Sequence, residues 1–551
     1  MHWWKDRVAY QIYPRSFQDS NNDGIGDIPG IISRLDEIKD LGAGIIWLSP
    51  VYKSPDADNG YDISDYCSVD PKFGGMRDME MLFAEAAKRD IRIIMDMVIN
   101  HTSDEHEWFK KSRDPASPYR DYYIWRPGKN GKPPNNWTGF FMGEVWEYDA
   151  QSNEYYLHLF DKKQPDLNYK NPRVIEEIKE ILRFWLDKGA SGFRCDVINI
   201  LYKTSLDDGE KSMAVQGIEH YKCQEGNHAI LRELRREVFD HYDCFTVGET
   251  VMVDLEEAKL LSDESRKELD MLFYFEHLEI DRRIARFIPK KFRALKLLEV
   301  LTKWQRGLDW NALYLENHDQ ARIVSHFGAA KKSASPDGKP ARYRERSAKM
   351  LAILELTLRG TPFIYQGQEI GMTNFDYKSL DEIDDVETRG LDRLMKQMHI
   401  PGFLRWKWIK ASSRDNARTP MQWDGGENAG FSRAKPWLGV NANYRYINYA
   451  SQKDNPGSVL NFYKTLIALR QKTGCLKQGE FIPLYADNRL MCYRRKLGDE
   501  VYTIALNFSP REITLPKKAA GFLTGTPCIS AAGRTALEGK LLPWEGILLK
   551  G

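Results

Sequence analysis

An arginine and an aspartate two residues apart, Arg194 and Asp196, are the side chains in this 551-residue chain whose spacing first indicates chemistry. They follow the apolar lead-in 190–193, and the period-2 alternation of a β-strand would place both on one face. Arginine and aspartate are almost never fully buried unless they are paired. The pair therefore predicts a cleft in which the cation holds the carboxylate ionised, or else an ion pair that only closes a strand.

Three other strand-like stretches also end in acids and histidines. The first ends in Asp96, Asn100 and His101, the second in Glu249, and the third in the run 316–319. In a parallel barrel the strands all deliver their carboxyl ends to one face, where catalysis takes place. One carboxylate at a strand end is more often structural, but four such ends in one chain indicate an active site.

The elements that must position these residues are legible along the chain. Eight β-rich runs ending in polar residues occur at 8–17, 43–50, 92–100, 192–199, 244–250, 271–275, 311–319 and 362–369. Helical stretches separate them, and the stretch 174–186 keeps the i, i+3/i+4, i+7 apolar pattern between Pro172 and Gly189. The alternation predicts a (β/α)8 TIM barrel.

Two intervals do not fit a minimal barrel, and the last part of the chain has a different texture. We expect the barrel to comprise residues 1–101 and 171–477, with an inserted domain at 102–170 after the third strand. The interval 374–449 should be an excursion over the barrel mouth. Short alternating strands with Gly and Pro turns predict a C-terminal antiparallel β-sandwich domain at 478–551.

Composition excludes several classes of partner. Lys+Arg 80 against Asp+Glu 79 gives a net charge of +1, so no global field attracts nucleic acid or an anionic membrane. Aromatic residues make up 12%, which suits the apolar faces of sugars. The seven scattered cysteines form no CxxC pair and are interpreted as free, buried thiols in a reducing compartment. Without an apolar N-terminal segment or a run of about 18 apolar residues, we expect a soluble, cytoplasmic protein. The oligomeric state stays open, with a monomer plausible.

The strand-end segments, in this order, resemble the conserved regions of the α-amylase family of glycoside hydrolases across the whole chain. Four further stretches are similar to the oligo-1,6-glucosidase and α-glucosidase branch of that family. They are YQIYPRSF at 10–17, DNGYD at 58–62, QPDLN at 164–168 and RDNARTPMQW at 414–423.

The resemblance implies Asp196 as nucleophile, Glu249 as general acid/base, and Asp319 as a third carboxylate that binds sugar hydroxyls. Retaining hydrolysis needs two carboxyls roughly 5–5.5 Å apart, one ionised and one protonated. Arg194 beside Asp196 would keep the nucleophile ionised, whereas Glu249, with no adjacent cation in the sequence, would keep its proton.

The resemblance also implies a pocket around the non-reducing glucose. Asp58 and Arg418 would fix its distal hydroxyls, and Tyr61 would offer a stacking face unless it is a half-buried aromatic of a turn. The full set of implied substrate-binding residues is Asp58, Tyr61, His101, Gln164, Arg194, Val197, His318 and Arg418. A pocket closed behind the first glucose makes the enzyme exo-acting.

Val197, directly after the nucleophile, is expected to lean toward the leaving sugar and to favour α-1,6 over α-1,4 linkages. The alternative is that Val197 only packs against the helix after the fourth strand. Three positions depart from the commonest branch pattern, namely Glu316, Gln368 and Cys195, and they could alter subsite preference.

The stretch 19–27 places oxygen ligands at alternate positions around a glycine turn, as a Ca²⁺ loop requires. Position twelve is Gly30 rather than Glu, so the loop is not an EF-hand. The resemblance implies one structural Ca²⁺, or Mg²⁺, bound by Asp19, Asn21, Asp23, the Ile25 carbonyl and Asp27. The alternative is a metal-free Asx-rich turn. No organic cofactor is expected.

The sequence therefore predicts an exo-acting, retaining α-glucosidase that hydrolyses α-1,6 bonds of isomaltose, isomalto-oligosaccharides and related short α-glucosides. Three alternatives stay open: a trehalose-6-phosphate hydrolase, which would need a cationic pocket, a sucrose isomerase, and a non-catalytic barrel scaffold.

Overall fold

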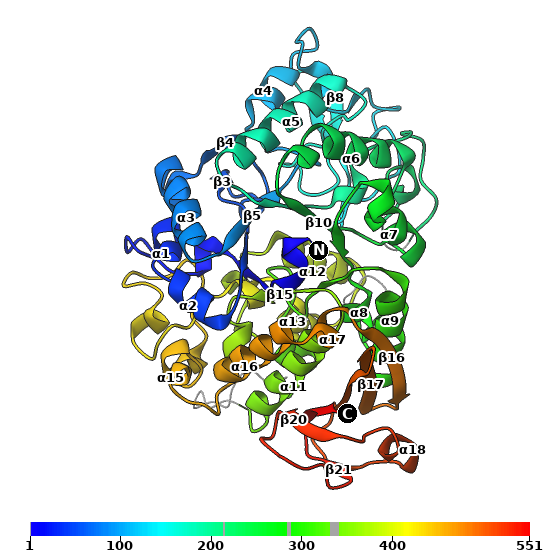
Figure 1. Ribbon diagram of the computed structural model, residues 1–551. Coiled ribbons are helices and arrows are strands. Elements are labelled where there is room, and N and C mark those ends of the chain that lie inside the picture. The colour runs from blue at the N-terminus through cyan, green and yellow to red at the C-terminus, as the bar shows by residue number, and fades with distance from the viewer. Residues whose placement is uncertain (1, 213–214, 284–287, 331–340) are drawn as a thin grey trace.

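The centre of the molecule is an eight-stranded parallel sheet, seen in a computed structural model that describes residues 2–212, 215–283, 288–330 and 341–551 (Figure 1). Its order is β11-β10-β9-β5-β2-β1-β15-β14, and the end strands β11 and β14 lie against each other, so the sheet forms a nearly closed barrel. The strands are β1 (Ala9–Ile12), β2 (Ile45–Leu48), β5 (Arg92–Met97), β9 (Gly192–Cys195), β10 (Phe245–Glu249), β11 (Met271–Phe273), β14 (Ala312–Leu313) and β15 (Thr361–Tyr365). The predicted TIM barrel is confirmed, with one strand in each of the eight predicted runs.

Helices cover the outside of this barrel. They are α2 (Leu35–Leu41), α3 (Met76–Lys88), α5 (Pro172–Asp187), α6 (Glu225–Glu237), α7 (Leu255–Ser262), α9 (Ala294–Gly307), α11 (Arg344–Thr357) and α16 (Val459–Lys472). Helix α5 shows why they form: the Asn171 side chain accepts from the Arg173 N–H, Pro172 occupies the first turn, and the apolar face is buried.

The strands end earlier than the predicted runs because the polar residues after them turn into short helical segments. Residues after β9 form the 3-10 helix η5 (Ile198–Ile200), and those after β15 form η9 (Gln368–Ile370). The chemistry-bearing side chains thus stand on the last strand residues and the first loop residues, at the mouth of the barrel.

Between β5 and α5 the chain forms a small sheet of its own, at the top of Figure 1. Strands β6 (Trp125–Arg126), β8 (Glu154–Leu157) and β7 (Trp146–Asp149) are antiparallel in that order, and α4 (Glu107–Ser112) precedes them. Its apolar cluster includes Trp137 and Val145 and also takes in Val197 and Val251 from barrel loops. Shared burial therefore fixes this segment to the barrel mouth.

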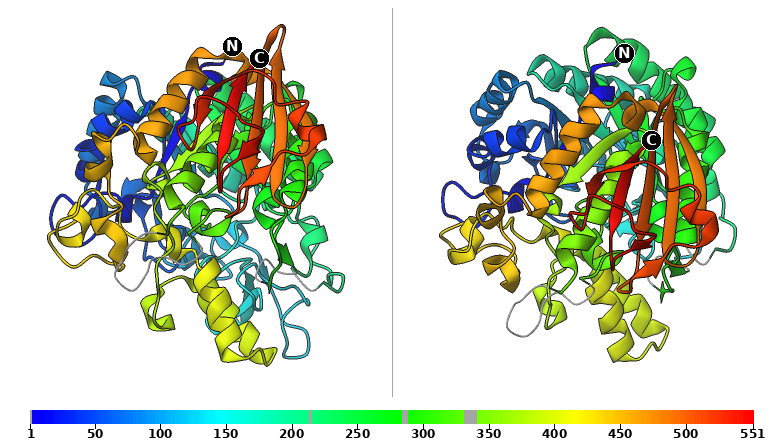
Figure 2. Two further views of the ribbon diagram at one scale, coloured as in Figure 1. Left: turned by 90° about the horizontal axis from the view of Figure 1, so that it is seen from below. Right: turned by 60° about the horizontal axis from the view of Figure 1, so that its bottom comes forward.

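Between β15 and α16 a second segment carries α12 (Val386–Gln397), α13 (Gly402–Ser412), α14 (Asp415–Arg418) and α15 (Tyr449–Lys453). In the left view of Figure 2, the yellow-green helices α12 and α13 project on the same side as the cyan inserted segment. Ile383, Leu391, Met395 and Ile409 form their shared core. The two long excursions therefore flank one mouth.

The chain ends in an antiparallel sheet of five strands, in the order β16 (Glu480–Ala486), β17 (Leu490–Leu497), β18 (Glu500–Asn507), β22 (Gly546–Lys550) and β20 (Thr526–Ser530). The ribbon of β19 (Ile513–Thr514) and β21 (Lys540–Leu541) forms a second layer, and Ile513, Leu541 and Ile547 belong to one apolar cluster between them. The sheet also contacts α9 and α11 of the barrel.

One glycine governs the approach of the two central strands. Gly192, at the start of β9, has φ 137°, and a Cβ there would lie 2.0 Å from the carbonyl oxygen of Phe245. Only glycine tolerates both the dihedral and the contact. Because Arg194 follows in the same strand and Asp196 comes directly after it, this approach sets their distance from Glu249 on β10.

Within the described ranges, no helix is both long and apolar enough to cross a membrane. All seven cysteines are free, but Cys67 and Cys528 are exposed, which corrects the prediction that the thiols are buried.

Candidate active site

The carboxyl ends of the barrel strands open into a cavity of about 690 Å³. Eight of the predicted site residues line it: Asp58, Tyr61, His101, Gln164, Asp196, Val197, Glu249 and Asp319. The other three, Arg194, His318 and Arg418, are each at most 1% exposed and lie behind these residues, where they contact them.

Arg194 is shared by carboxylates from three adjacent strands. Its Nη1 lies 2.6 Å from Oδ1 of Asp96 and 2.6 Å from Oδ1 of Asp196, and its Nη2 lies 2.7 Å from Oε2 of Glu249. The expectation that Glu249 has no neighbouring cation is therefore wrong. Strand β9 pairs with β5 on one side and with β10 on the other, so the guanidinium of Arg194 on β9 reaches all three acids.

The two central carboxyls nevertheless differ in pKa in the predicted sense. Burial raises the pKa of Asp196 to about 6, against the opposing effect of Arg194. Burial raises the pKa of Glu249 to about 7, with Arg194 again opposing and the negative charges of Asp196 and Asp319 adding to the rise. Near neutral pH, Asp196 is the one that can ionise to attack and Glu249 the one that can carry a proton.

The arrangement of these carboxyls suits double displacement. The side chains of Asp196 and Glu249 are in hydrogen-bonding contact, far closer than the 6.5–9.5 Å or so that an inverting pair needs for an intervening water. The backbone N–H of Val197 lies 3.3 Å from Oε2 of Glu249. Val197 achieves this with φ 36°, a strained value for a β-branched residue.

Asp319 is the most strongly acidic of the three predicted catalytic carboxyls. Oδ2 lies 3.1 Å from Nε2 of His318, while Oδ1 lies 2.7 Å from Nη2 of Arg418 and 3.3 Å from Nη1 of Arg414. Burial opposes ionisation, but these three partners hold the pKa of Asp319 well below its usual range. Asp319 can therefore accept hydrogen bonds from sugar hydroxyls over the whole neutral range.

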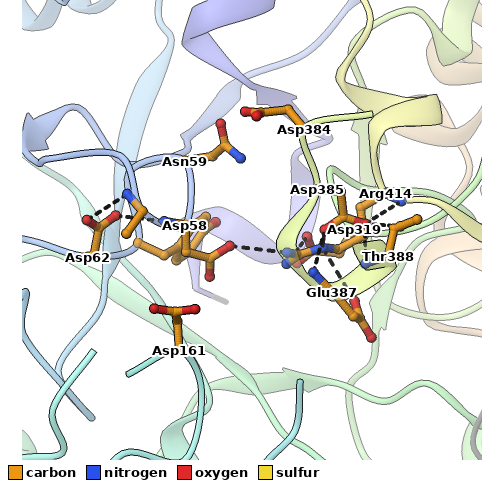
Figure 3. A network of polar contacts seen from close by, with 12 residues as sticks. Asp58, Asn59, Asp62, Asp161, Asp319, Asp384, Asp385, Glu387, Thr388 and Arg414 are labelled. Carbon is orange, nitrogen blue, oxygen red and sulfur yellow. Dashed lines mark hydrogen bonds and ion pairs between the residues drawn. The ribbon is translucent and has the colours of Figure 1, made fainter. Parts of the chain in front are cut away.

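Arg414 is the site residue that the sequence prediction missed. It links Asp58 (Nη2 to Oδ1, 3.1 Å) to Asp319 and to Asp385 (Nε to Oδ1, 2.7 Å), and Figure 3 shows this network from close by. Arg418, predicted for this role, instead donates to the His318 carbonyl at 3.1 Å and to Asp319. The two arginines are one helical turn apart at α14, so the motif gave no signal as to which one faces the cavity.

The aromatic and polar wall beside Asp58 is tightly connected. The Tyr61 ring stacks on His318, with centroids 5.3 Å apart and planes 2° apart, and its hydroxyl donates to Oδ2 of Asp96 at 3.0 Å. Gln164 donates to Oδ2 of Asp58 at 3.3 Å, and its Nε2 lies 3.1 Å from Nε2 of His101. Burial lowers the pKa of His101, which favours the neutral ring.

The three departures from the branch pattern are all buried away from the cavity lining. Glu316 pairs with Nη1 of Arg322 at 3.1 Å, Gln368 donates to Tyr463 at 3.2 Å, and Cys195 is fully buried in β9. They contact the barrel core rather than the cavity, so a direct effect on a subsite is not supported.

The predicted metal loop 19–27 is folded by its own acids. Oδ1 of Asp19 accepts from the N–H of Asn22 at 2.7 Å, Oδ1 of Asp23 from Ile25 at 2.8 Å, and Oδ1 of Asp27 from Gly30 at 2.7 Å. Oxygen donors at alternate positions fit the chemistry of a hard cation. Another group of acids, outside this loop, was not predicted. Within the described part of the chain, Glu176, Glu233 and Glu237 have ligand atoms that all lie within 4.8 Å of one another. Lys179 already forms an ion pair with each of these acids, with Nζ at 2.8, 2.6 and 2.5 Å from the three.

Comparison with known proteins identifies the family. Residues 11–479 match the model described as the alpha amylase catalytic domain. The chain is 49% identical to an oligo-1,6-glucosidase of Parageobacillus thermoglucosidasius, covering 92% of this chain and 91% of that protein. It is 42% identical to a glucan 1,6-alpha-glucosidase of Streptococcus pneumoniae, covering 100% and 99%. Among solved structures, a trehalulose synthase (41% identity, TM-score 0.93) and a trehalose-6-phosphate hydrolase of Bacillus licheniformis (40%, 0.91) each cover 100% of both chains. The chain therefore belongs to the α-amylase family of glycoside hydrolases.

Proposed function

We propose that this protein is an exo-acting, retaining α-glucosidase that removes single glucose units from the non-reducing ends of isomaltose, isomalto-oligosaccharides and related short α-1,6-glucosides. The observation that carries the proposal is the cavity in which Asp196 and Glu249 meet on one guanidinium beside the Asp58–Arg414 bridge. The curated relatives, oligo-1,6-glucosidases among them, support the same linkage.

In the first step, ionised Asp196 attacks the anomeric carbon while protonated Glu249 donates its proton to the leaving glycosidic oxygen. The bond from that carbon to the leaving oxygen breaks, and a covalent glucosyl ester of Asp196 forms. Arg194 pairs with both acids and holds them in position. It therefore stays beside the negative charge as that charge passes from Asp196 to Glu249. In the second step Glu249, now ionised, takes a proton from water, and that water displaces Asp196 and releases α-glucose.

Asp58, Asp319 and Arg414 would receive the distal hydroxyls of the glucose. Arg414 sits between the two carboxylates and pairs with both, which would place a charged wall against the distal end of that sugar. A chain can then enter only by its non-reducing end, which makes the enzyme exo-acting.

The charge of the cavity argues against a phosphorylated substrate. Its lining includes nine carboxylates: Asp58, Asp196, Glu249, Asp254, Glu276, Glu279, Asp319, Asp385 and Glu387. Of the described residues, three lysine or arginine side chains line it, and each has an acidic neighbour: Arg282 with Asp281, Lys303 with Glu276, and Arg414 with Asp58. The field of this described lining repels phosphate. A sucrose isomerase differs in where the leaving sugar goes, so product analysis separates it.

Free thiols support a cytoplasmic location, which we also propose, and a neutral oligosaccharide is the partner that the cavity fits.

The first prediction concerns the reaction itself. Incubation with isomaltose should release glucose, and the glucose released from 4-nitrophenyl α-glucoside should appear first as the α-anomer in a proton NMR time course, because two displacements retain configuration. Asp196→Asn and Glu249→Gln should each lower kcat by several orders of magnitude with an unchanged circular dichroism spectrum. Appearance of β-glucose first, or more than about a tenth of the activity in either variant, would show that the assignment of the two acids is wrong. Sucrose converted to an isomeric disaccharide without isomaltose hydrolysis would favour the isomerase.

The second prediction concerns pH. Asp196 must be ionised, so kcat/KM should rise as pH increases through about 6. Glu249 must be protonated, so kcat/KM should fall again as pH increases past about 7. The two acids interact, so the limbs of the bell report the pair. A rate that stays flat from pH 5 to pH 9 would contradict the assignment.

The third prediction concerns linkage. Val197 lines the cavity and packs with the inserted segment's apolar cluster rather than only on the helix after β9. An α-1,6 leaving sugar is spaced by an extra methylene and tolerates the Val197 methyls, whereas an α-1,4 ring lies closer. Val197→Thr should lower the ratio of kcat/KM for isomaltose to kcat/KM for maltose, mainly by raising activity on maltose. The change in this ratio should correspond to about 1–3 kcal/mol at most. An unchanged ratio with lowered stability would reduce Val197 to a packing role.

The fourth prediction concerns the metal. We propose that Asp19, Asn21, Asp23, Asp27 and the Ile25 carbonyl hold one structural Ca²⁺ or Mg²⁺. A cation bound only by the folded state stabilises it by mass action, so chelation should lower Tm while kcat at 25 °C stays nearly constant. Asp23→Asn should remove the dependence of Tm on calcium, and Glu176→Gln, at the acids around Lys179, should leave it intact. Loss of activity on chelation in protein that stays folded would contradict a purely structural role.

A further inference from the structure

A glycine inside helix α12 touches the inserted segment across the cavity mouth. Gly390 is buried, and a Cβ added to it would lie 2.6 Å from the carbonyl oxygen of Phe141 and 3.7 Å from its carbonyl carbon. The neighbour is backbone, so a side chain at position 390 would have to push the Phe141 loop away. Helix α12 and the loop at Phe141, about 250 residues apart in sequence, thus pack so closely that even one methyl group would not fit between them.

The helix around Gly390 gives no local reason for a glycine. Alanine is favoured over glycine in a helix interior, and α12 is otherwise well formed, with Asp385 accepting from the N–H groups of Glu387 and Thr388 at its N-terminus. Gly402, in the neighbouring α13, contrasts with it, because a Cβ there would meet only Nη2 of Arg405, at 3.6 Å. The close approach of Phe141 is therefore what the glycine at 390 permits.

The loop 139–143 that approaches Gly390 is held firmly. Gly139 N–H donates to the Gly143 carbonyl at 2.9 Å, and Met142 N–H donates to the Gly139 carbonyl at 3.2 Å. The Phe140 ring stacks on Phe160 with centroids 5.0 Å apart and planes 15° apart. A loop so anchored cannot yield to a side chain at position 390 without disturbing its own contacts.

The contact also lies beside the sugar-binding cation. The guanidinium of Arg414 stands over the Phe141 ring, 5.2 Å from its centroid. Phe141 and Met142 line the cavity from the inserted segment, and Thr388 and Leu391 line it from α12. Figure 3 shows Asp58 approaching Arg414 from one side, with Asp385, Glu387 and Thr388 on the other. The Phe141–Gly390 contact therefore covers Arg414 on the side of the distal hydroxyls.

We infer that Gly390 is a specificity-determining position: the bare Cα lets the Phe141 loop seal the cavity beside Arg414 and so excludes glucosides that carry a substituent on the distal hydroxyls of the first glucose. The inference rests on the proposed exo-glucosidase function and deepens it. In that function Asp58 and Arg414 would bind those hydroxyls, and the Phe141–Gly390 contact fills the space beside Arg414.

The test compares Gly390→Ala with the matched control Gly402→Ala. Substrates are 4-nitrophenyl α-glucoside and the same glucoside methylated at O4 or O6. Gly390→Ala should lower kcat/KM for the free glucoside about tenfold, mainly through KM, the order of one methylene-sized misfit in a pocket. The ratio of methylated to free glucoside turnover should rise about tenfold. Gly402→Ala should leave both quantities unchanged.

A second variant guards against misfolding of the first. Phe141→Ala removes the ring over Arg414 but keeps the backbone contact, and it should raise the same ratio. If folded Gly390→Ala and Phe141→Ala both keep the wild-type ratio, the inference is overturned. If the wild-type protein releases no glucose from isomaltose, the proposed function is wrong. If the wild-type protein is active but the variants keep its ratio of methylated to free glucoside turnover, only the role of Gly390 is wrong.

Discussion

The site depends on one buried guanidinium shared by three carboxylates. Removing a charge from water costs several kcal/mol, and Arg194 is 1% exposed, so it must be compensated on every side. Asp96, Asp196 and Glu249 supply that compensation from β5, β9 and β10, which are neighbours in the sheet. Three acids around one cation leave a surplus of negative charge, so they do not all ionise at ordinary cost: burial raises the pKa of Asp96 and of Asp196 to about 6 and that of Glu249 to about 7. The barrel thus creates an acid and a nucleophile from similar side chains.

A second cation, Arg414, plays the same part for the loops. It joins Asp58, Asp319 and Asp385, which come from three separate connections above the barrel. Asp385 also caps α12 through the N–H groups of Glu387 and Thr388, so the orientation of the arginine is tied to the start of that helix. A shift of α12 would therefore move Arg414, and with it the wall that limits the cavity.

The sequence predicts the barrel well because the signal is local: apolar runs that alternate with amphipathic helices, each closed by polar residues, as in α5. Asp196, Glu249 and Asp319 were predictable because each stands at or shortly after the end of such a run, in a segment that resembles a conserved region of the family. Contacts between residues distant in sequence were not predictable. Glu249 has a cation only because β10 pairs with β9, and Arg414 reaches Asp58 although Arg418 has the same charge in the same motif. The metal loop and the domain boundaries stay predictions.

Chemistry and specificity are carried by different parts of this chain. The acids stand on strands whose spacing is fixed by hydrogen bonding and by contacts such as Gly192 against Phe245, so their pKa separation belongs to the scaffold. The cavity walls come from two excursions held by Phe160, Arg414 and the contact at Gly390, none of which touches Arg194 within the described contacts. Loops on a rigid barrel can change without altering the strand ends. Substitutions in the excursions that spare Asp319 and its partners Arg414 and Arg418 should therefore alter which glucoside enters while leaving the pH limbs in place, because those limbs are set by the carboxyls around Arg194 and by the charge of Asp319.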